Sequence, residues 1–196
     1  MRLFVAVQVG ADVAAAAGAL QRDLRRRADR LAPSARVTWV APAALHLTLR
    51  FLGEIDPDAV PAIERVLAPP LEVEAVPLVV TFSGVGLFPP RGAPRVVWSG
   101  VVQGADGLGA LALAIGRRLA EIGLPPEPRA FAPHLTLGRV RRDGGLRSSW
   151  IEGLATAPLG TVPVASVALV ESRLRPEGPD HRTRLETPLV ARPTSR

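Results

Sequence analysis

Two of the three histidines in this chain lie in identical tetrapeptides. His46 and His134 each begin the sequence His-Leu-Thr-Leu, which places Thr48 and Thr136 two residues further on. Histidine titrates near neutrality, so a pair of imidazoles can remove one proton and supply another in the same reaction. Threonine hydroxyls, with arginine side chains nearby, can hold the non-bridging oxygens of a phosphate. The repeated tetrapeptide therefore predicts acid–base catalysis on a phosphate ester.

A single His-x-Thr sequence would indicate no more than a polar pair on a strand. The chain has nine threonines in 196 residues. A threonine two residues after each of two specified histidines therefore arises by chance only about once in several hundred such chains. This coincidence favours a functional pair over a purely structural one.

The two histidines need strands that present them to a common space. In a strand, residues two apart point to the same face and neighbours point to opposite faces. His46 and Thr48 should therefore share one face, while Leu47 and Leu49 are buried on the other. The second tetrapeptide follows the same rule.

The two motifs end two similar stretches of sequence. Each stretch contains a predicted strand, the triplet Gly-Ala-Asp (10–12 and 104–106), a helix with an apolar face, a proline-containing loop and the His-Leu-Thr-Leu strand. This pattern indicates a duplicated unit, and duplicated units tend to pack about a pseudo-twofold axis. We therefore expect the motif strands to face each other across a groove. Alternating strands and helices place the fold in the α/β or α+β class without fixing the order of the strands.

Hydrophobic periodicity predicts the other elements. Asp12 is expected to cap the first long helix, and Asp56 to cap the helix that starts at Pro57. Strands are predicted at residues 3–9, 36–40, 45–52, 78–82, 95–102, 134–140, 162–170 and 184–190; helices at 13–31, 57–67 and 108–122; and a glycine- and proline-rich loop at 84–94.

The composition indicates a folded protein with an excess of positive charge. The net charge is +6, the isoelectric point is near 11.4, and every basic side chain other than histidine is arginine. Such a charge favours a polyanionic partner, although a solvated arginine surface explains it equally well. The absence of cysteine excludes disulfides and cysteine-bound metals. No stretch approaches the roughly 18 apolar residues of a membrane span, so we expect a cytoplasmic protein.

Beyond the histidine motifs, several segments resemble a known family in the order in which they occur. They are Arg-Leu-Phe-Val-Ala-Val at 2–7, residues 39–52 with His-Leu-Thr-Leu-Arg-Phe-Leu-Gly, Gly-Leu-Phe-Pro at 86–89, Arg-Val-Val-Trp at 95–98, residues 133–139, and Glu-Ser-Arg-Leu at 171–174. On these segments the chain resembles the two-histidine (2H) phosphoesterase superfamily. Within it, the chain is similar to the LigT-like RNA 2′,3′-cyclic phosphodiesterases, also called RNA 2′-5′ ligases.

The resemblance implies an α+β fold and a reaction. The fold would be one bilobed domain over residues 1–196, in which two pseudo-twofold-related lobes with antiparallel sheets line a central cleft. The reaction would hydrolyse a terminal 2′,3′-cyclic phosphate on RNA to a 2′-phosphate. His46 would donate a proton to the departing 3′-oxygen, His134 would activate water, and Thr48 and Thr136 would bind the phosphate. Run backwards, the same pair would join a cyclic-phosphate end to a 5′-hydroxyl.

Two arginines are further candidates for phosphate contacts. Arg50 shares the face of His46 if the strand stays regular. Arg139 matches a basic residue of the family motif, but strict alternation points it away from His134 unless a bulge intervenes. Phe51 and Trp98 are expected to be core residues rather than platforms for bases.

The third histidine marks a departure from the family. The family commonly has Gly-Pro-x-Tyr where this chain has Gly-Pro-Asp-His at 178–181, and the chain contains no tyrosine. We expect His181 to fill the tyrosine position without taking part in catalysis. The three histidines lack the local spacing of metal motifs and have no acidic cluster beside them, so we expect neither metal nor cofactor.

Three functions remain open from the sequence. The first is the phosphodiesterase acting on RNA ends, with tRNA fragments among its substrates. The second is the same chemistry on a small cyclic phosphate, such as a cyclic nucleotide or an ADP-ribose derivative. The third is a non-catalytic RNA-binding module, which two complete histidine motifs argue against because binding alone needs no pair of titratable imidazoles. We expect a monomer that makes no membrane contact.

Overall fold

The structure is a computed structural model that describes residues 1–175 and 178–192. Its strands are β1 (Arg2–Gln8), β2 (Arg36–Trp39), β3 (His46–Glu54), β4 (Leu71–Val73), β5 (Leu78–Phe88), β6 (Val96–Gln103), β7 (His134–Arg142), β8 (Pro158–Val164), β9 (Ser166–Arg175) and β10 (Gly178–Ala191). Its helices are α1 (Ala11–Leu31), α2 (Val60–Leu67) and α3 (Ala105–Ala120), and its short 3-10 helices are η1 (Pro42–Ala44), η2 (Pro57–Ala59) and η3 (Ser148–Ile151).

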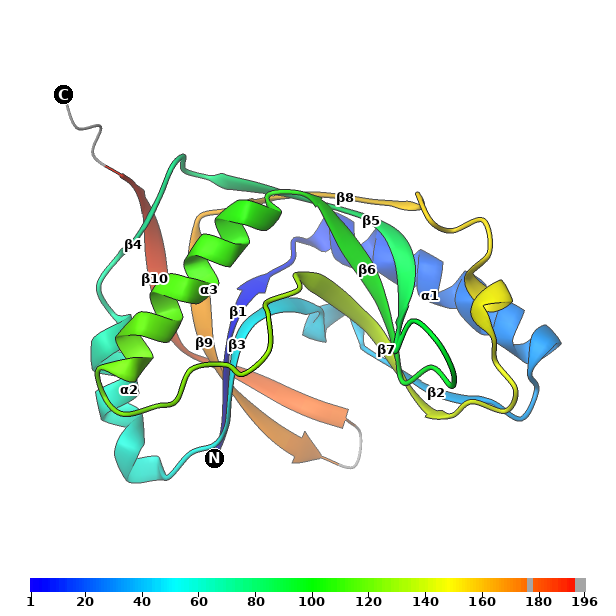
Figure 1. The fold of residues 1–196 in the computed structure, drawn as a ribbon, viewed down its shortest axis with the longest axis horizontal. Helices are drawn as coiled ribbons and strands as arrows, with labels where there is room; N and C mark the ends of the chain where they lie inside the picture. The colour runs from blue at the N-terminus through cyan, green and yellow to red at the C-terminus, as the bar shows by residue number, and fades with distance from the viewer. Residues whose placement is uncertain (176–177, 193–196) are drawn as a thin grey trace.

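The described strands form two five-stranded sheets, each containing one histidine motif (Figure 1). Sheet 1 has the order β3-β1-β9-β10-β4, and sheet 2 has the order β2-β7-β6-β5-β8. All neighbouring strands are antiparallel except β10 and β4, which are parallel. The strands β3 and β7 contact each other between the sheets. The predicted α+β class with antiparallel sheets is confirmed.

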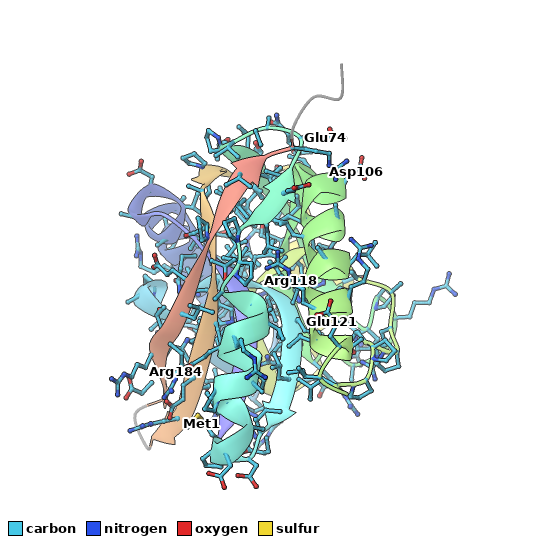
Figure 2. The ribbon with its side chains drawn as sticks, turned by 90° about the vertical axis from the view of Figure 1, so that its left-hand side faces the viewer. Met1, Glu74, Asp106, Arg118, Glu121 and Arg184 are labelled. Atoms are coloured by element: carbon cyan, nitrogen blue, oxygen red, sulfur yellow. The ribbon has the colours of Figure 1, made fainter. Side chains whose placement is uncertain are left out.

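Each long helix packs on the sheet that holds the motif of the other half of the sequence. α1 precedes the first motif but lies against β8 of sheet 2, and α3 precedes the second motif but lies against β3 and β4 of sheet 1. α2 contacts both α3 and β10 on the outside of sheet 1 (Figures 1 and 2). The buried face of α1 carries Val13, Ala17, Leu24 and Ala28, which recur at helical spacing. Each half therefore supplies the helix that covers the other half's sheet.

One hydrophobic cluster extends through both sheets. It contains Leu47 and Leu49 from the first motif together with Leu135 and Leu137 from the second, as the alternation predicts. The indole of Trp150 is fully buried in it and donates from Nε1 to the carbonyl oxygen of Leu24 at 2.8 Å, which joins η3 to α1. Because one cluster includes side chains of both sheets, we infer that the two half-lobes form one domain.

Several predicted boundaries are wrong for local reasons. The segment expected to be a loop from residue 84 instead continues β5 as far as Phe88. Gly84 has φ +76° where the pairing with β6 shifts register, so it marks a bulge within the strand. Gly10, not Asp12, is the N-cap of α1, and Asp12 lies in the first turn, where a carboxylate favours the helix dipole.

Other differences lie near the C-terminus and in the helix after β3. The strand predicted at 162–170 is divided between β8 and β9, and β4 was not predicted. The predicted cap at Asp56 is confirmed, because its carboxylate accepts a hydrogen bond from the backbone N–H of Asp58 at 3.0 Å. Among the described residues, no helix is both long enough and apolar enough to cross a membrane.

Candidate active site

Both motif strands contain a bulge at the same position. In β3, Thr48 pairs with Ala6 and Arg50 pairs with Val5, so that Leu49 is the extra residue. In β7, Leu137 is the extra residue in the same way, between the paired Thr136 and Gly138. A bulge of this kind puts two consecutive side chains on one face and reverses the alternation beyond it. The two strands accordingly show the same order of buried and exposed positions.

The bulge in β3 turns Arg50 away from His46. The Arg50 side chain is 9% exposed and points to the buried side of the strand, near the end of α3. Its Nη1 forms an ion pair with Glu127 at 3.3 Å, and its Nη2 donates to the carbonyl oxygen of Pro125. The expectation that Arg50 shares the face of His46 is therefore wrong, because the strand does not stay regular.

The corresponding bulge in β7 turns Arg139 towards the site. Arg139 is exposed and lies beside Thr38 of β2 and Val96 of β6 in the pairing register. Its positive charge lowers the pKa of His46, a residue of the other sheet. Arg139 therefore lies within electrostatic range of the first motif as well as on the strand of the second.

The two histidines are held by the same hydrogen bond. Nδ1 of His46 lies 2.8 Å from the carbonyl oxygen of Ala44, and Nδ1 of His134 lies 2.7 Å from the carbonyl oxygen of Ala132. A carbonyl only accepts hydrogen bonds, so each Nδ1 must carry the proton in the neutral ring. Each Nε2 is then the nitrogen left to take up or release a proton. Thr48 and Thr136 follow on the same faces and are partly exposed.

Aromatic side chains from neighbouring strands hold each imidazole. The ring of Phe4 stacks on His46 with centroids 4.6 Å apart and an interplanar angle of 24°. Phe88 meets His134 edge-on at 5.2 Å and stacks on Trp98 at 4.9 Å. The indole of Trp98 lies over Gly86, where any Cβ would overlap it. The sequence gives no direct sign of these ring contacts, because they depend on which strands pair.

Two further rings belong to the neighbourhood of His46. His181 lies edge-on to His46 with centroids 5.1 Å apart, and edge-on to Phe4 at 5.2 Å. Phe51, expected to be a core residue, is 58% exposed because the bulge turns it to the His46 face, where its ring lies 6.3 Å from that of Phe4. Trp98 is partly buried beside His134 rather than fully enclosed.

The environment of His46 favours its neutral form. The pKa of His46 is lowered to about 4, mainly by burial; the hydrogen bond from Nδ1 to Ala44 opposes this lowering, and the nearby His181 and Arg139 add to it. Burial also lowers the pKa of His181, against the effect of the Asp180 carboxylate. In the described part of the chain, no three histidine, cysteine or acidic side chains gather in a way that could hold a metal ion.

A buried glutamine supports the bulge in β7. Gln21 of α1 is 6% exposed, and its Nε2 donates to the carbonyl oxygens of Leu137 at 2.9 Å and Val40 at 2.8 Å. Leu137 is the extra residue of the bulge that turns Arg139 to the site. Gln21 therefore connects α1, from the first half of the chain, to the motif strand of the second. Sequence reasoning missed this residue because a single glutamine on a helix gives no signal.

Arg50→Ala should act through the segment that leads to His134. Arg50 holds Pro125 and Glu127 at the start of this segment, and the segment also contains Ala132, whose carbonyl orients His134. Losing hydrogen bonds of a buried charged group costs about 1.5–3 kcal/mol. We expect a lower melting temperature and a kcat several-fold below that of the wild type, with KM little changed.

Arg118→Ala is the matched control for this change. Arg118, on α3, donates to the carbonyl oxygens of Pro69 and Pro70 in the connection between α2 and β4 (Figure 2). Its loss should lower stability without changing kcat, since this connection contains neither histidine. A higher KM for Arg50→Ala at unchanged stability would instead restore Arg50 as a substrate contact.

Known proteins of one family are similar to this chain. The chain matches the family model described as LigT like Phosphoesterase over residues 13–98 and 100–179. It is 34% identical to the RNA 2′,3′-cyclic phosphodiesterase of Archaeoglobus fulgidus over 93% of this chain and 97% of that protein. It is 32% identical to the protein of the same name from Thermotoga maritima over 95% of this chain and 94% of that one.

Solved structures show the same fold. A Thermus thermophilus protein superposes with a TM-score of 0.76 at 30% identity, covering 96% of this chain and 98% of that one. Escherichia coli LigT complexed with 3′-AMP superposes with a TM-score of 0.71 at 23% identity, covering 96% and 97%, which indicates a shared fold. The family model covers most of the chain and includes both histidine motifs. The chain therefore belongs to the LigT-like phosphoesterase family.

Proposed function

We propose that the protein hydrolyses a 2′,3′-cyclic phosphate at the end of RNA and leaves a 2′-phosphate. The observation that carries this proposal is the matched pair of imidazoles, each fixed through Nδ1 to a backbone carbonyl on two strands that contact each other. The relatives named RNA 2′,3′-cyclic phosphodiesterase support the choice of substrate. RNA fragments with cyclic ends, tRNA fragments among them, are the expected partners.

In the proposed reaction, one histidine acts as base and the other as acid. Nε2 of His134 takes a proton from water as the water oxygen bonds to phosphorus. The bond from phosphorus to the 3′-oxygen breaks, and Nε2 of His46 gives its proton to that oxygen. The product carries a 2′-phosphate and a 3′-hydroxyl, and the two imidazoles then exchange protons with solvent. With a 5′-hydroxyl in place of water as the nucleophile at the cyclic phosphate, the same pair would form a 2′-5′ linkage as the bond to the 3′-oxygen breaks.

Side chains on the histidine faces suit the rest of the substrate. Arg139 is a cation that can donate two hydrogen bonds to phosphate oxygens as negative charge builds up on them. The hydroxyls of Thr48 and Thr136 can donate to the same group. The exposed ring of Phe51 offers a surface on which a base can stack. These groups hold phosphate without a metal ion, so we propose that the reaction is metal-independent.

Substrate binding should change the protonation of His46. Its pKa in the protein alone is about 4, so the acid of the reaction is unprotonated near neutrality before substrate binds. A phosphodiester anion beside Nε2 favours the charged imidazolium and raises that pKa. Binding should therefore take up a proton, and affinity should weaken as the pH rises from about 4 towards the raised pKa.

Proton uptake can be measured by calorimetry on the His134→Ala variant, whose turnover is slowed. A 2′,3′-cyclic-phosphate oligonucleotide would be titrated into it at pH 6.5 in two buffers of different ionisation enthalpy. We expect uptake approaching one proton for each molecule bound, and none for the double variant His46→Ala/His134→Ala, which keeps His181. Equal uptake by both variants would mean that His46 does not receive the proton.

Product analysis in excess EDTA tests the proposed function directly. RNA with a 2′,3′-cyclic end should be converted fully to the 2′-phosphate form, which phosphorus NMR distinguishes from the 3′-phosphate form. The rate should equal that without EDTA, because no step needs an ion. Mainly 3′-phosphate product would mean that the substrate lies the other way round. Loss of activity in EDTA, restored by a divalent ion, would contradict the metal-independent mechanism.

A further inference from the structure

Beyond its bulge, β7 carries arginines on the same face as Arg139. Arg141 lies two residues further along the strand and is exposed. Its Nε donates to Oγ1 of Thr38 at 3.3 Å, and Thr38 is paired with Arg139 in the register between β2 and β7. This hydrogen bond places Arg141 on the face that carries Thr38 and Arg139.

The neighbouring strand β2 extends this face with a third arginine. Arg36 and Thr38 are two residues apart and exposed, whereas Val37 and Trp39 between and beside them pack against the core. Arg36 therefore shares the face of Thr38. Its guanidinium donates to the carbonyl oxygens of Pro33 and Ala35, at 3.1 and 2.8 Å, which leaves its charge unneutralised. We call Arg139, Arg141 and Arg36 the arginine strip.

The arginine strip has no acidic partners in residues 1–175 and 178–192. Arginines elsewhere form ion pairs: Arg27 with Asp23, Arg50 with Glu127, Arg173 with Glu171 and Arg184 with Glu64. None of the three arginines of the strip forms an ion pair with a described carboxylate. Three uncompensated cations on one face create a positive potential that attracts a polyanion.

The corresponding end of the other motif strand lacks this charge. Counted from the histidine, Phe51 and Gly53 of β3 occupy the positions of Arg139 and Arg141. β3 then ends at Glu54, which pairs with Arg2 at 3.2 Å and with the N-terminal ammonium at 3.5 Å. The two motif strands therefore differ in charge at this end, and the uncompensated arginines follow β7 and its neighbour β2 rather than β3.

We propose that the arginine strip binds the RNA backbone on the 5′ side of the cyclic phosphate. This inference rests on the proposed function. Arg139 serves the reacting phosphate, Arg141 follows it two residues later at a second bulge in β7, and Arg36 lies beyond it on β2, paired with Arg142. These two arginines bind phosphodiesters upstream of the terminal nucleotide, which a cyclic mononucleotide does not have. The preferred substrate is therefore an oligonucleotide rather than a small cyclic phosphate.

The test compares two substrates with the same terminal nucleotide. One is a tetranucleotide with a 2′,3′-cyclic end, and the other is the cyclic mononucleotide alone. The variant Arg36→Gln/Arg141→Gln should lose roughly tenfold in kcat/KM on the tetranucleotide at low salt and little on the mononucleotide. The slope of log Kd against log salt for the 2′-phosphate tetranucleotide should flatten by about 0.7 for each arginine removed.

Arg22→Gln/Arg25→Gln is the matched control. It removes the same formal charge from exposed positions of α1, the helix that packs on the opposite side of sheet 2. The proposal is supported if kcat/KM falls only in the variant Arg36→Gln/Arg141→Gln and only on the tetranucleotide. Equal losses on both substrates, equal losses in the control, or no loss would overturn it. If the wild type hydrolyses neither substrate, the proposed function fails, while the binding comparison still decides whether the strip holds RNA.

Discussion

His46→Ala and His134→Ala should each lower kcat by about 10²–10⁴-fold on RNA with a 2′,3′-cyclic end, the usual range for one acid–base group. Each change removes one of the two Nε2 atoms left available by the hydrogen bonds to Ala44 and Ala132. If the two imidazoles act on one transition state, the double variant should lose much less than the product of the single losses. The arginines and threonines remain, so RNA binding should survive in all three variants.

His181→Ala is the matched control for this prediction. His181 lies against His46, with ring centroids 5.1 Å apart, but belongs to β10 and to neither motif. We expect it to keep kcat within a few-fold of the wild type. A loss of about 100-fold would make His181 a third catalytic group. A variant without His134 that turned over near the wild-type rate would contradict the paired mechanism.

Trp150→Ala should cost about 3–5 kcal/mol in the free energy of unfolding, as the truncation of a fully buried aromatic side chain usually does. The indole is 0% exposed and packs edge-on against Trp39 with centroids 6.2 Å apart. Its N–H donates to the Leu24 carbonyl, so the change also removes the bond between η3 and α1. α1 covers sheet 2, and Gln21 of α1 donates a hydrogen bond to the carbonyl oxygen of Leu137. The loss of stability should therefore also affect the strand that carries the second motif.

Urea titration measures this effect, with Leu113→Ala as control. Leu113 lies on α3 and is 67% exposed, so its truncation should change the free energy of unfolding by less than about 0.5 kcal/mol. A loss of less than about 1 kcal/mol for Trp150→Ala would mean that the core closes around the missing ring, or that η3 packs less tightly than the structure shows.

The spacing of hydrophobic residues along the chain was sufficient to predict the elements whose buried faces follow a helical or a strand period. The 3.6-residue spacing of Val13, Ala17, Leu24 and Ala28 predicted α1, and the two-residue spacing predicted the buried leucines of both motifs. The duplicated order of strand, Gly-Ala-Asp, helix and motif predicted two similar lobes, because repetition is visible without knowing which strands pair. It did not reveal that each helix packs on the other half's sheet.

Which side chains surround the histidines depends on which strands pair and in what register, and the sequence alone does not show this. Alternation counted from His46 assigned Arg50 to the site, and alternation counted from His134 pointed Arg139 away from it unless a bulge intervened. The bulges at Leu49 and Leu137 decide both, turning Arg50 inward and Arg139 to the site. A bulge is specified by the register of the neighbouring strands, so no count along one strand finds it. The glycines at 84 and 86 were interpreted as part of a loop, but they lie within β5. Gly84 forms a bulge there and Gly86 makes room for the indole of Trp98, and both features depend on how β5 pairs with β6.

The paired-histidine mechanism is tested most directly by changing the leaving group. In a cyclic substrate whose bridging 3′-oxygen is replaced by sulfur, a thiolate departs without needing a proton, because its pKa of about 8.5 is far below that of an alcohol. The loss in kcat caused by His46→Ala should then be at least about tenfold smaller than on the oxygen substrate. The loss caused by His134→Ala should stay the same, because water still has to be activated. Rescue of His134→Ala instead, or equal defects on both substrates, would contradict the assigned roles.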